Sequence, residues 1–168
     1  MSSLIRIDNI LSTEERKLMI KESKPLFLTG QQLNDYYDRT GYPPCDQTPP
    51  LLHEYPAFVT PIRNMLLKIQ TETGMTFMTN KAWINRNIGK RNEECWHNHE
   101  QAPYVCVYYI KTIPFLNSGT QFRKKFVRSP QNSLIIFPGQ IEHTVPTYPH
   151  LFNWTRRYTF SMDLFTVQ

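Results

Sequence analysis

The stretch Tyr104-Val105-Cys106-Val107-Tyr108-Tyr109-Ile110 is rich in β-branched and aromatic side chains, which fit the pleated surface of a β-strand. From residue 77 onward the chain repeats this pattern in short segments separated by Pro, Gly, Asn and Ser. Two packed antiparallel sheets, as in a jelly roll, bury one face of each such strand and leave an open end for functional side chains. The predicted strands are 77–88, 104–111, 120–127, 133–137, 143–148 and 156–165.

The residues before this region predict helices instead. Ser12 and Glu15 form a capping box at the start of a first helix, at 15–21. Thr60 followed by Pro61 predicts the start of a second helix, and Gly74 predicts its end. Residues 31–56 have several prolines and little periodicity, which is typical of an irregular segment. Such a segment could act as a lid over a binding site or pack against one sheet, and the sequence leaves both interpretations open.

Helices followed by strands indicate an α+β fold. We expect a helical part at about 1–76 to buttress the outer face of a β-barrel core at about 77–168. The length of 168 residues fits a single domain, 1–168. With 40% hydrophobic and 13% aromatic residues and no low-complexity run, the composition is that of a compact globular protein.

The composition also bears on the compartment. No apolar stretch approaches the roughly 20 residues that a membrane helix needs, and the N-terminal residues resemble no cleavable signal. The three cysteines, Cys45, Cys95 and Cys106, are scattered and odd in number, which predicts no disulfide framework and favours a reducing compartment. We therefore expect a cytoplasmic protein that does not contact a membrane.

A net charge of +5 is compatible with an anionic partner. The most basic segment, 122–128, contains Arg123, Lys124, Lys125 and Arg128 together with two phenylalanines. It could contact nucleic acid, or it could be an ordinary solvated strand or loop, and no nucleic-acid-binding motif accompanies it. Because the binding of a small dianion also requires positive charge, the net charge selects neither interpretation.

The histidines carry the clearest chemical signal. Alternate residues of a strand point to the same face, so His97 and His99 can reach one ion, and His143 can supply a third ligand from a neighbouring strand. Three protein ligands leave coordination positions open, which is typical of a catalytic metal site. His53 and His150 have no partner at a useful spacing and are not expected to be ligands. Cys95 shares the parity of the pair and is expected to be a small core residue.

Four motifs in order give the chain a family resemblance: Trp96-His97-Asn98-His99-Glu100, the 104–110 strand, Ile136-Phe137-Pro138-Gly139-Gln140-Ile141-Glu142-His143, and Arg157-Tyr158-Thr159-Phe160-Ser161. They resemble the Fe(II)/2-oxoglutarate-dependent oxygenases, and look closest to the small oxygenases of bacteria and their phages. The resemblance covers about half of the chain and implies a double-stranded β-helix, with Fe(II), 2-oxoglutarate and O2 as reactants. It also implies hydroxylation of a primary substrate and a bacterial or phage origin.

The resemblance assigns roles to individual residues. His97, His99 and His143 would bind the metal, although His99 stands where most members have Asp or Glu. Glu100 as a ligand, and no metal at all, remain alternatives. Arg157 and Thr159 would bind the far carboxylate of 2-oxoglutarate, with Arg156 facing away. The expected catalytic residues are the three histidines and Arg157. Further cofactor contacts are expected from Tyr109, with Tyr108 as its alternate, and secondarily from Asn85 and Asn87.

Three other functions remain open. A cupin-like three-His dioxygenase would use the same ligands without a keto acid, but it would give Arg157 no task. A hydrolytic zinc site would need a proton shuttle that the sequence does not identify. A non-catalytic barrel that binds a peptide, sugar or nucleic acid would have no reason to keep three ligands. The primary substrate could be a protein side chain, a nucleobase or a free metabolite.

Overall fold

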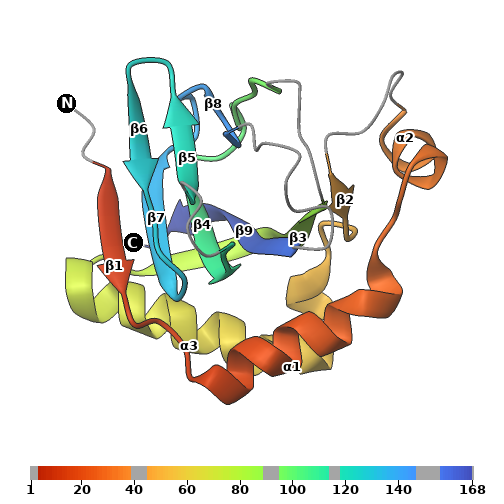
Figure 1. Cartoon of the computed structure of the whole chain (residues 1–168). Helices are drawn as coiled ribbons and strands as arrows, with labels where there is room; N and C mark the ends of the chain where they lie inside the picture. Colours follow the sequence, from red (N-terminus) through yellow and green to blue (C-terminus); the bar gives the residue numbers. More distant parts are fainter. Residues whose placement is uncertain (1–3, 39–44, 89–94, 114–117, 147–155, 168) are drawn as a thin grey trace.

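The computed structural model describes residues 4–38, 45–88, 95–113, 118–146 and 156–167, and the strands among them form two antiparallel sheets (Figure 1). The large sheet has six strands in the order β1-β7-β4-β9-β3-β2, and the small sheet has three in the order β6-β5-β8. The strands are β1 (Ile5–Asp8), β2 (Asp46–Gln47), β3 (Phe77–Ile88), β4 (Tyr104–Lys111), β5 (Gly119–Phe122), β6 (Lys125–Arg128), β7 (Ser133–Pro138), β8 (His143–Thr144) and β9 (Arg156–Thr166).

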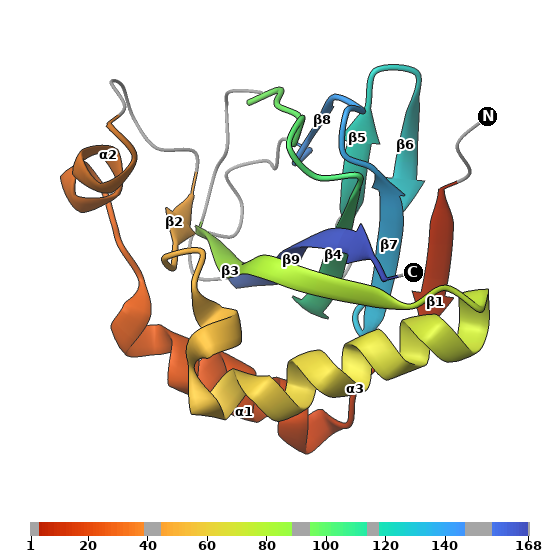
Figure 2. The ribbon, with the colours of Figure 1, turned by 180° about the vertical axis from the view of Figure 1, so that it is seen from behind.

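Two helices cover one face of the large sheet, as expected from the sequence. Helices α1 (Thr13–Ser23) and α3 (Pro56–Thr73) lie side by side beneath this sheet in both views (Figures 1 and 2). Burial of their apolar side chains against the sheet is the main source of stability here. The helix side of this core includes Met19, Phe58, Ile62, Met65 and Ile69, and the sheet side includes Ile84, Cys106, Tyr108, Phe160, Met162 and Leu164.

The opposite face of the large sheet meets the small sheet. A second, smaller core fills the space between them, with Val105, Val107, Tyr109, Phe122, Ile135 and Phe137. Strand β9 shows how one element serves both faces, because successive side chains of a strand alternate in direction. Its residues 158, 160, 162 and 164 lie in the helix-side core, and its residues 157, 159, 161 and 163 line a pocket on the other side.

The helix predictions are confirmed in part. The capping box is present, with Glu15 N–H donating to Ser12 Oγ at 3.1 Å and Ser12 N–H donating to Glu15 Oε2 at 2.9 Å. Gly74 ends α3 with φ of 71°, a left-handed conformation that suits glycine. The predicted start of α3 at Thr60–Pro61 is wrong, because Pro56 occupies the first turn and Pro61 lies inside the helix. The earlier start allows Phe58 to pack into the core.

Several strand predictions are also corrected. The N-terminal part is not purely helical, since β1 and β2 add strands to both edges of the large sheet. The predicted irregular segment 31–56 contains the helix α2 (Gln31–Tyr37), β2 and the 3-10 turn η2 (Leu52–Glu54). The predicted strand 120–127 is a hairpin of β5 and β6. Of the predicted strand 143–148, only His143–Thr144 is a strand, and residues 147–148 lie outside the described residues.

The basic segment 122–128 forms this hairpin. Arg123 Nε donates to Glu142 Oε2 at 2.9 Å, and its guanidinium lies 4.0 Å from the centre of the Trp96 ring. Phe122 is buried between the sheets, while Lys125 and Arg128 are exposed. Among the helices that the structure describes, none combines the length and apolar character needed to span a bilayer.

Candidate metal centre

The backbone around the three histidines is fixed by main-chain hydrogen bonds. His97 N–H donates to the His143 carbonyl oxygen at 3.1 Å, and His143 N–H donates to the His97 carbonyl oxygen at 2.9 Å. His99 N–H donates to the Gly139 carbonyl oxygen at 2.7 Å. His97 and His99 therefore lie in an extended segment that is held by one isolated bridge. The prediction that they belong to a regular strand is wrong. Their two-residue spacing still directs both rings toward His143, because the segment is extended.

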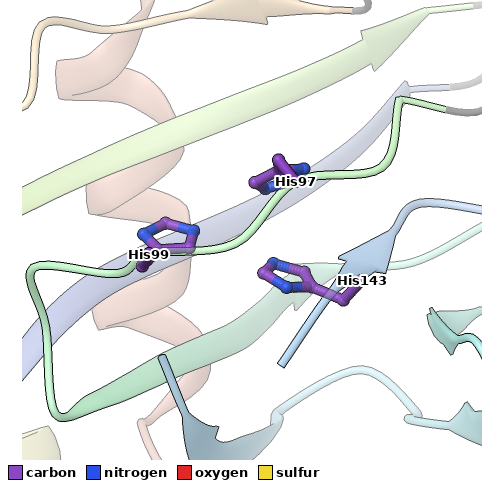
Figure 3. Close-up of side chains that lie close together, drawn as sticks. All are labelled: His97, His99 and His143. Carbon is purple, nitrogen blue, oxygen red and sulfur yellow. The ribbon is translucent and has the colours of Figure 1, made fainter. Parts of the chain in front are cut away.

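The three imidazoles form one cluster (Figure 3). One ring nitrogen from each histidine lies within 4.8 Å of the others, a grouping that can hold a metal ion. The ring centroids of His97 and His143 are 4.3 Å apart, and that of His99 is 5.4 Å from each of them. The structure thus brings together the three residues predicted to be ligands.

The hydrogen bonds of the rings favour one tautomer. Nδ1 of His97 lies 3.0 Å from the Cys95 carbonyl oxygen, and Nδ1 of His143 lies 3.1 Å from the Ile141 carbonyl oxygen. Nδ1 of His99 lies 2.9 Å from Oδ1 of Asp163. An acceptor oxygen beside each Nδ1 favours a proton on that nitrogen and the lone pair on Nε2. The three rings are therefore oriented as metal ligands usually are.

Electrostatics favour neutral imidazole at the deepest position. The pKa of His143 is lowered from 6.5 to about 3, chiefly by burial. The nearby His97 also lowers this pKa, and its effect is larger than the rise caused by the hydrogen bond with the Ile141 carbonyl. Phe137 packs edge-on against the His143 ring at a centroid distance of 4.8 Å. Because only a neutral imidazole has a lone pair to give to a metal, His143 is in its ligand form at neutral pH.

Asp163 belongs to the site although no sequence motif indicates it. This carboxylate is 6% exposed and holds the Nδ1 edge of His99, while the Trp83 ring stacks near His99 at 5.5 Å and 15°. Its even spacing from Arg157 along β9 is the signal that could have identified it, since both must face the same side of the strand.

The alternative ligands suggested by the sequence lie elsewhere. Glu100 is exposed, accepts a hydrogen bond from Asn98 at 3.2 Å, and lines a smaller polar recess of about 320 Å³ that His99 and Asp163 also line. It does not belong to the histidine cluster. Cys95 is exposed, so its expected place in the core is wrong. It lines the pocket beside the histidines, on the side that its strand parity with them predicts, but it is not part of the three-histidine cluster.

Arg157 is the second notable feature of the site. It is 1% exposed, and its guanidinium donates to Asn87 Oδ1 and to the Gly119 carbonyl oxygen, both at 3.1 Å. Its Nε and the Nδ2 of Asn87 are buried without a hydrogen-bond partner among the described residues. No described carboxylate forms an ion pair with it. Arg156 is exposed on the other face, as predicted. A buried cation without a counter-ion is costly, so this position favours an anionic ligand.

The two tyrosines of β4 point in opposite directions. Tyr109 lies on the Arg157 side, with its hydroxyl 2.6 Å from Thr120 Oγ1 and its ring 5.2 Å from the guanidinium. Tyr108 donates to Asn132 Oδ1 at 2.8 Å and belongs to the helix-side core, so the structure contradicts Tyr108 as a cofactor contact. Burial accordingly raises the pKa of Tyr108. The parity of Tyr109 with His99 predicts a shared face only if one uninterrupted strand joins them. The turn at 100–101 breaks that strand.

A pocket of about 530 Å³ connects the histidine cluster with Arg157. Thr159 and Asn85 face each other across β9 and β3, and both line this pocket. Val105 and Val107 contribute an apolar wall. Tyr37, Cys45 and Gln47, from the segment predicted to be irregular, line it as well. The structure thus places residues of this segment beside the pocket, where the sequence left a lid and packing equally open.

Comparison with known proteins was made by sequence and by structure. No family model and no curated protein matches the sequence. Among solved structures, HygX from Streptomyces hygroscopicus with nickel and 2-oxoglutarate bound matches with a TM-score of 0.68 and 10% identity, over 96% of this chain and 82% of HygX. A viral collagen prolyl hydroxylase from Paramecium bursaria Chlorella virus-1, in its complex with 2-oxoglutarate, matches with a TM-score of 0.63 and 11% identity. The match covers 98% of this chain and 96% of the hydroxylase.

The α-ketoglutarate-dependent epimerase SnoN from nogalamycin biosynthesis matches with a TM-score of 0.68 and 9% identity, over 98% of this chain and 78% of SnoN. These identities are low, and the shared feature is the arrangement of the elements over nearly the whole chain. The chain therefore shares the fold of HygX, the viral prolyl hydroxylase and SnoN.

Proposed function

We propose that the protein is an oxygenase that depends on Fe(II) and 2-oxoglutarate and hydroxylates a primary substrate, within a single domain, 1–168, built on a double-stranded β-helix. The observation that carries this proposal is the pairing of two features in one pocket: a three-imidazole cluster and a buried Arg157 that pairs with no carboxylate among the described residues. A metal needs the first, and the far carboxylate of a keto acid needs the second.

The residues present fit both groups. Three imidazoles with oriented Nδ1 atoms suit Fe(II) and leave coordination positions for the keto acid and O2. Arg157 has an unsatisfied buried Nε, and the Thr159 hydroxyl lies two residues further along the same face of β9. When bound, iron and 2-oxoglutarate supply oxidation of a C–H bond, with release of succinate and CO2.

The chain's own side chains prepare the site for this chemistry. His97, His99 and His143 hold the metal, and Arg157 with Thr159 fixes the far carboxylate by charge-assisted and hydroxyl hydrogen bonds. Asn87 holds the Arg157 guanidinium in place, and the Tyr109 ring packs beside it. Val105 and Val107 add an apolar wall to the pocket, and a less polar pocket strengthens the contacts between charged groups. Asn85 faces the same space and is a secondary contact.

An anaerobic titration tests the proposal. Addition of 2-oxoglutarate to the Fe(II) protein should produce the weak visible charge-transfer band of a chelated keto acid. The band should require much more 2-oxoglutarate in Arg157→Ala. Iron binding without any band would favour the second candidate, a cupin-like three-His dioxygenase that needs no keto acid, which the all-imidazole ligand set also suits. Absence of iron binding would favour a zinc site or a binding module.

A further inference from the structure

We propose that Asp163 is a positioning residue that supplies, through the His99 ring, the negative charge that the three-imidazole ligand set lacks. The proposal rests on the proposed metal site and extends it to a residue that no motif identified. Oδ1 of Asp163 lies 2.9 Å from Nδ1 of His99, and both side chains are largely shielded from solvent. Among the described residues, His99 is the single hydrogen-bond or ion-pair partner recorded for this carboxylate.

The three histidines differ in how they are oriented. His97 and His143 each turn Nδ1 toward a carbonyl oxygen two residues earlier in the chain, so their neutral acceptors are local. His99 has instead a charged acceptor that is 64 residues away in sequence. The nearly parallel Trp83 ring restricts the tilt of the His99 ring, and Asp163 restricts its rotation. His99 is therefore the ligand whose geometry depends on tertiary structure.

Strand pairing explains why the carboxylate lies in this position. Asp163 is opposite Val105 of β4 and Lys81 of β3, so it is on a central strand of the large sheet. A bulge between Thr79 and Lys81 shifts the register of β3 at this point. Beyond the bulge, Lys81 and Trp83 lie on the same face of β3, and both line the pocket with Asp163. No ion pair forms between Lys81 and Asp163, so the carboxylate is directed to His99.

The charges in the pocket also favour this role. A divalent ion, a keto-acid dianion, Arg157 and the pocket-lining Lys81 sum to +2, and the Asp163 carboxylate lowers the total to +1. Arg157 and Asp163 are six residues apart on one strand, which is about 20 Å, so they do not neutralise each other directly. A carboxylate that accepts a hydrogen bond from Nδ1–H raises the basicity of the ligating ring nitrogen. Loss of such a partner typically weakens metal binding about 10- to 100-fold.

Three variants test the proposal. Asp163→Asn keeps the shape and an acceptor oxygen but removes the charge, and Asp163→Ala removes both. Glu100→Gln is the matched control, because it removes one carboxylate adjacent to His99 in sequence that does not contact the ring. The measurements are the anaerobic Kd for Fe(II), by competition with a chromophoric chelator, and the Fe(III)/Fe(II) reduction potential. Circular dichroism verifies that each variant is folded.

We expect the Fe(II) Kd to rise about 10-fold in Asp163→Asn and up to about 100-fold in Asp163→Ala. The potential should rise in both variants, since a lost negative charge disfavours Fe(III). Glu100→Gln should change neither quantity. Wild-type Kd and potential in folded Asp163→Asn would overturn the role of Asp163 while leaving the proposed function intact. Fe(II) binding that depends on Asp163, without any keto-acid band, would support the role and contradict the proposed function.

Discussion

His97 and His143 form one antiparallel bridge in which each residue donates its N–H to the carbonyl oxygen of the other, at 3.1 and 2.9 Å. The side chains of two proposed ligands are thus positioned by a backbone pair that does not involve their rings. Replacing either side chain should leave this pair in place. The roles of these histidines in metal binding and in folding can therefore be separated by experiment.

His143→Ala should lose metal binding and stay folded. Removal of the buried ring should cost about 1–3 kcal/mol of unfolding free energy, while the main-chain bridge is retained. Affinity for Fe(II) should fall by more than about 100-fold, because loss of even an outer partner costs 10- to 100-fold. Anaerobic competition with a chelator measures the affinity, and urea unfolding measures the stability. His53→Ala is the control, and retained Fe(II) affinity in His143→Ala would remove His143 from the site.

Arg157→Ala should raise the 2-oxoglutarate concentration needed for half-saturation by about 30- to 150-fold, which corresponds to about 2–3 kcal/mol. The reason is loss of the buried cation that faces the pocket. Arg156→Ala removes the same charge from the exposed, opposite face of β9 and should leave the half-saturation concentration unchanged. Equal responses of the two variants would show that long-range charge, and not a contact by Arg157, governs the affinity.

Gly139→Ala should disturb the site through the backbone. A Cβ at this position would collide with the carbonyl oxygens of Ala102 and His99, both in the main chain. Overpacking of this kind costs about 1–3 kcal/mol, and here it would displace His99 and weaken Fe(II) binding. Gly74→Ala is the control: it has open space but a φ of 71°, so it should cost about 1 kcal/mol without altering the Fe(II) Kd. An unchanged Fe(II) Kd in Gly139→Ala would show that the segment can relax.

The pH dependence of stability should reveal the buried His143. In the metal-free protein its pKa is lowered to about 3 from an ordinary 6.5. Between these values the unfolded chain binds a proton that the folded chain does not, so the unfolding free energy should increase with pH by about 1.4 kcal/mol per unit. This contribution is complete above pH 6.5 and is lost as the pH falls toward 3. His143→Gln should have a correspondingly smaller slope, measured by urea unfolding after chelation, and an identical slope would contradict the burial effect.

Local patterns predicted the elements near the site well. The bounds of β3 and β4 agree with the predicted strands 77–88 and 104–111, and in β4 a run of β-branched and aromatic residues leaves few alternatives. The start of α3 was misplaced because two prolines, Pro56 and Pro61, offered competing signals and only tertiary packing of Phe58 distinguishes them. The hairpin turn between β5 and β6 contains Arg123 and Lys124 and has no glycine to mark it.

The site was predictable where its residues lie at fixed spacing in the chain. His97 and His99 are separated by one residue, and Arg157 and Thr159 likewise, so strand parity sufficed to group each pair. Asp163 was missed because strand parity places it on the same face as Arg157 but does not report its contact with His99, 64 residues away. The choice between Tyr108 and Tyr109 also required the structure, because the turn at 100–101 interrupts the parity count from His99.

The alternation along β9 has a consequence for how the chain can vary. Residues 157, 159, 161 and 163 line the pocket, while residues 158, 160, 162 and 164 hold the helices. Substitutions on one set can therefore change the chemistry of the pocket with little effect on the helix-side packing, and the reverse holds for the other set. Deletion of a single residue in this strand would exchange the two sets and place a guanidinium and a carboxylate against the helices. The strand can tolerate substitutions far more readily than any change in its length.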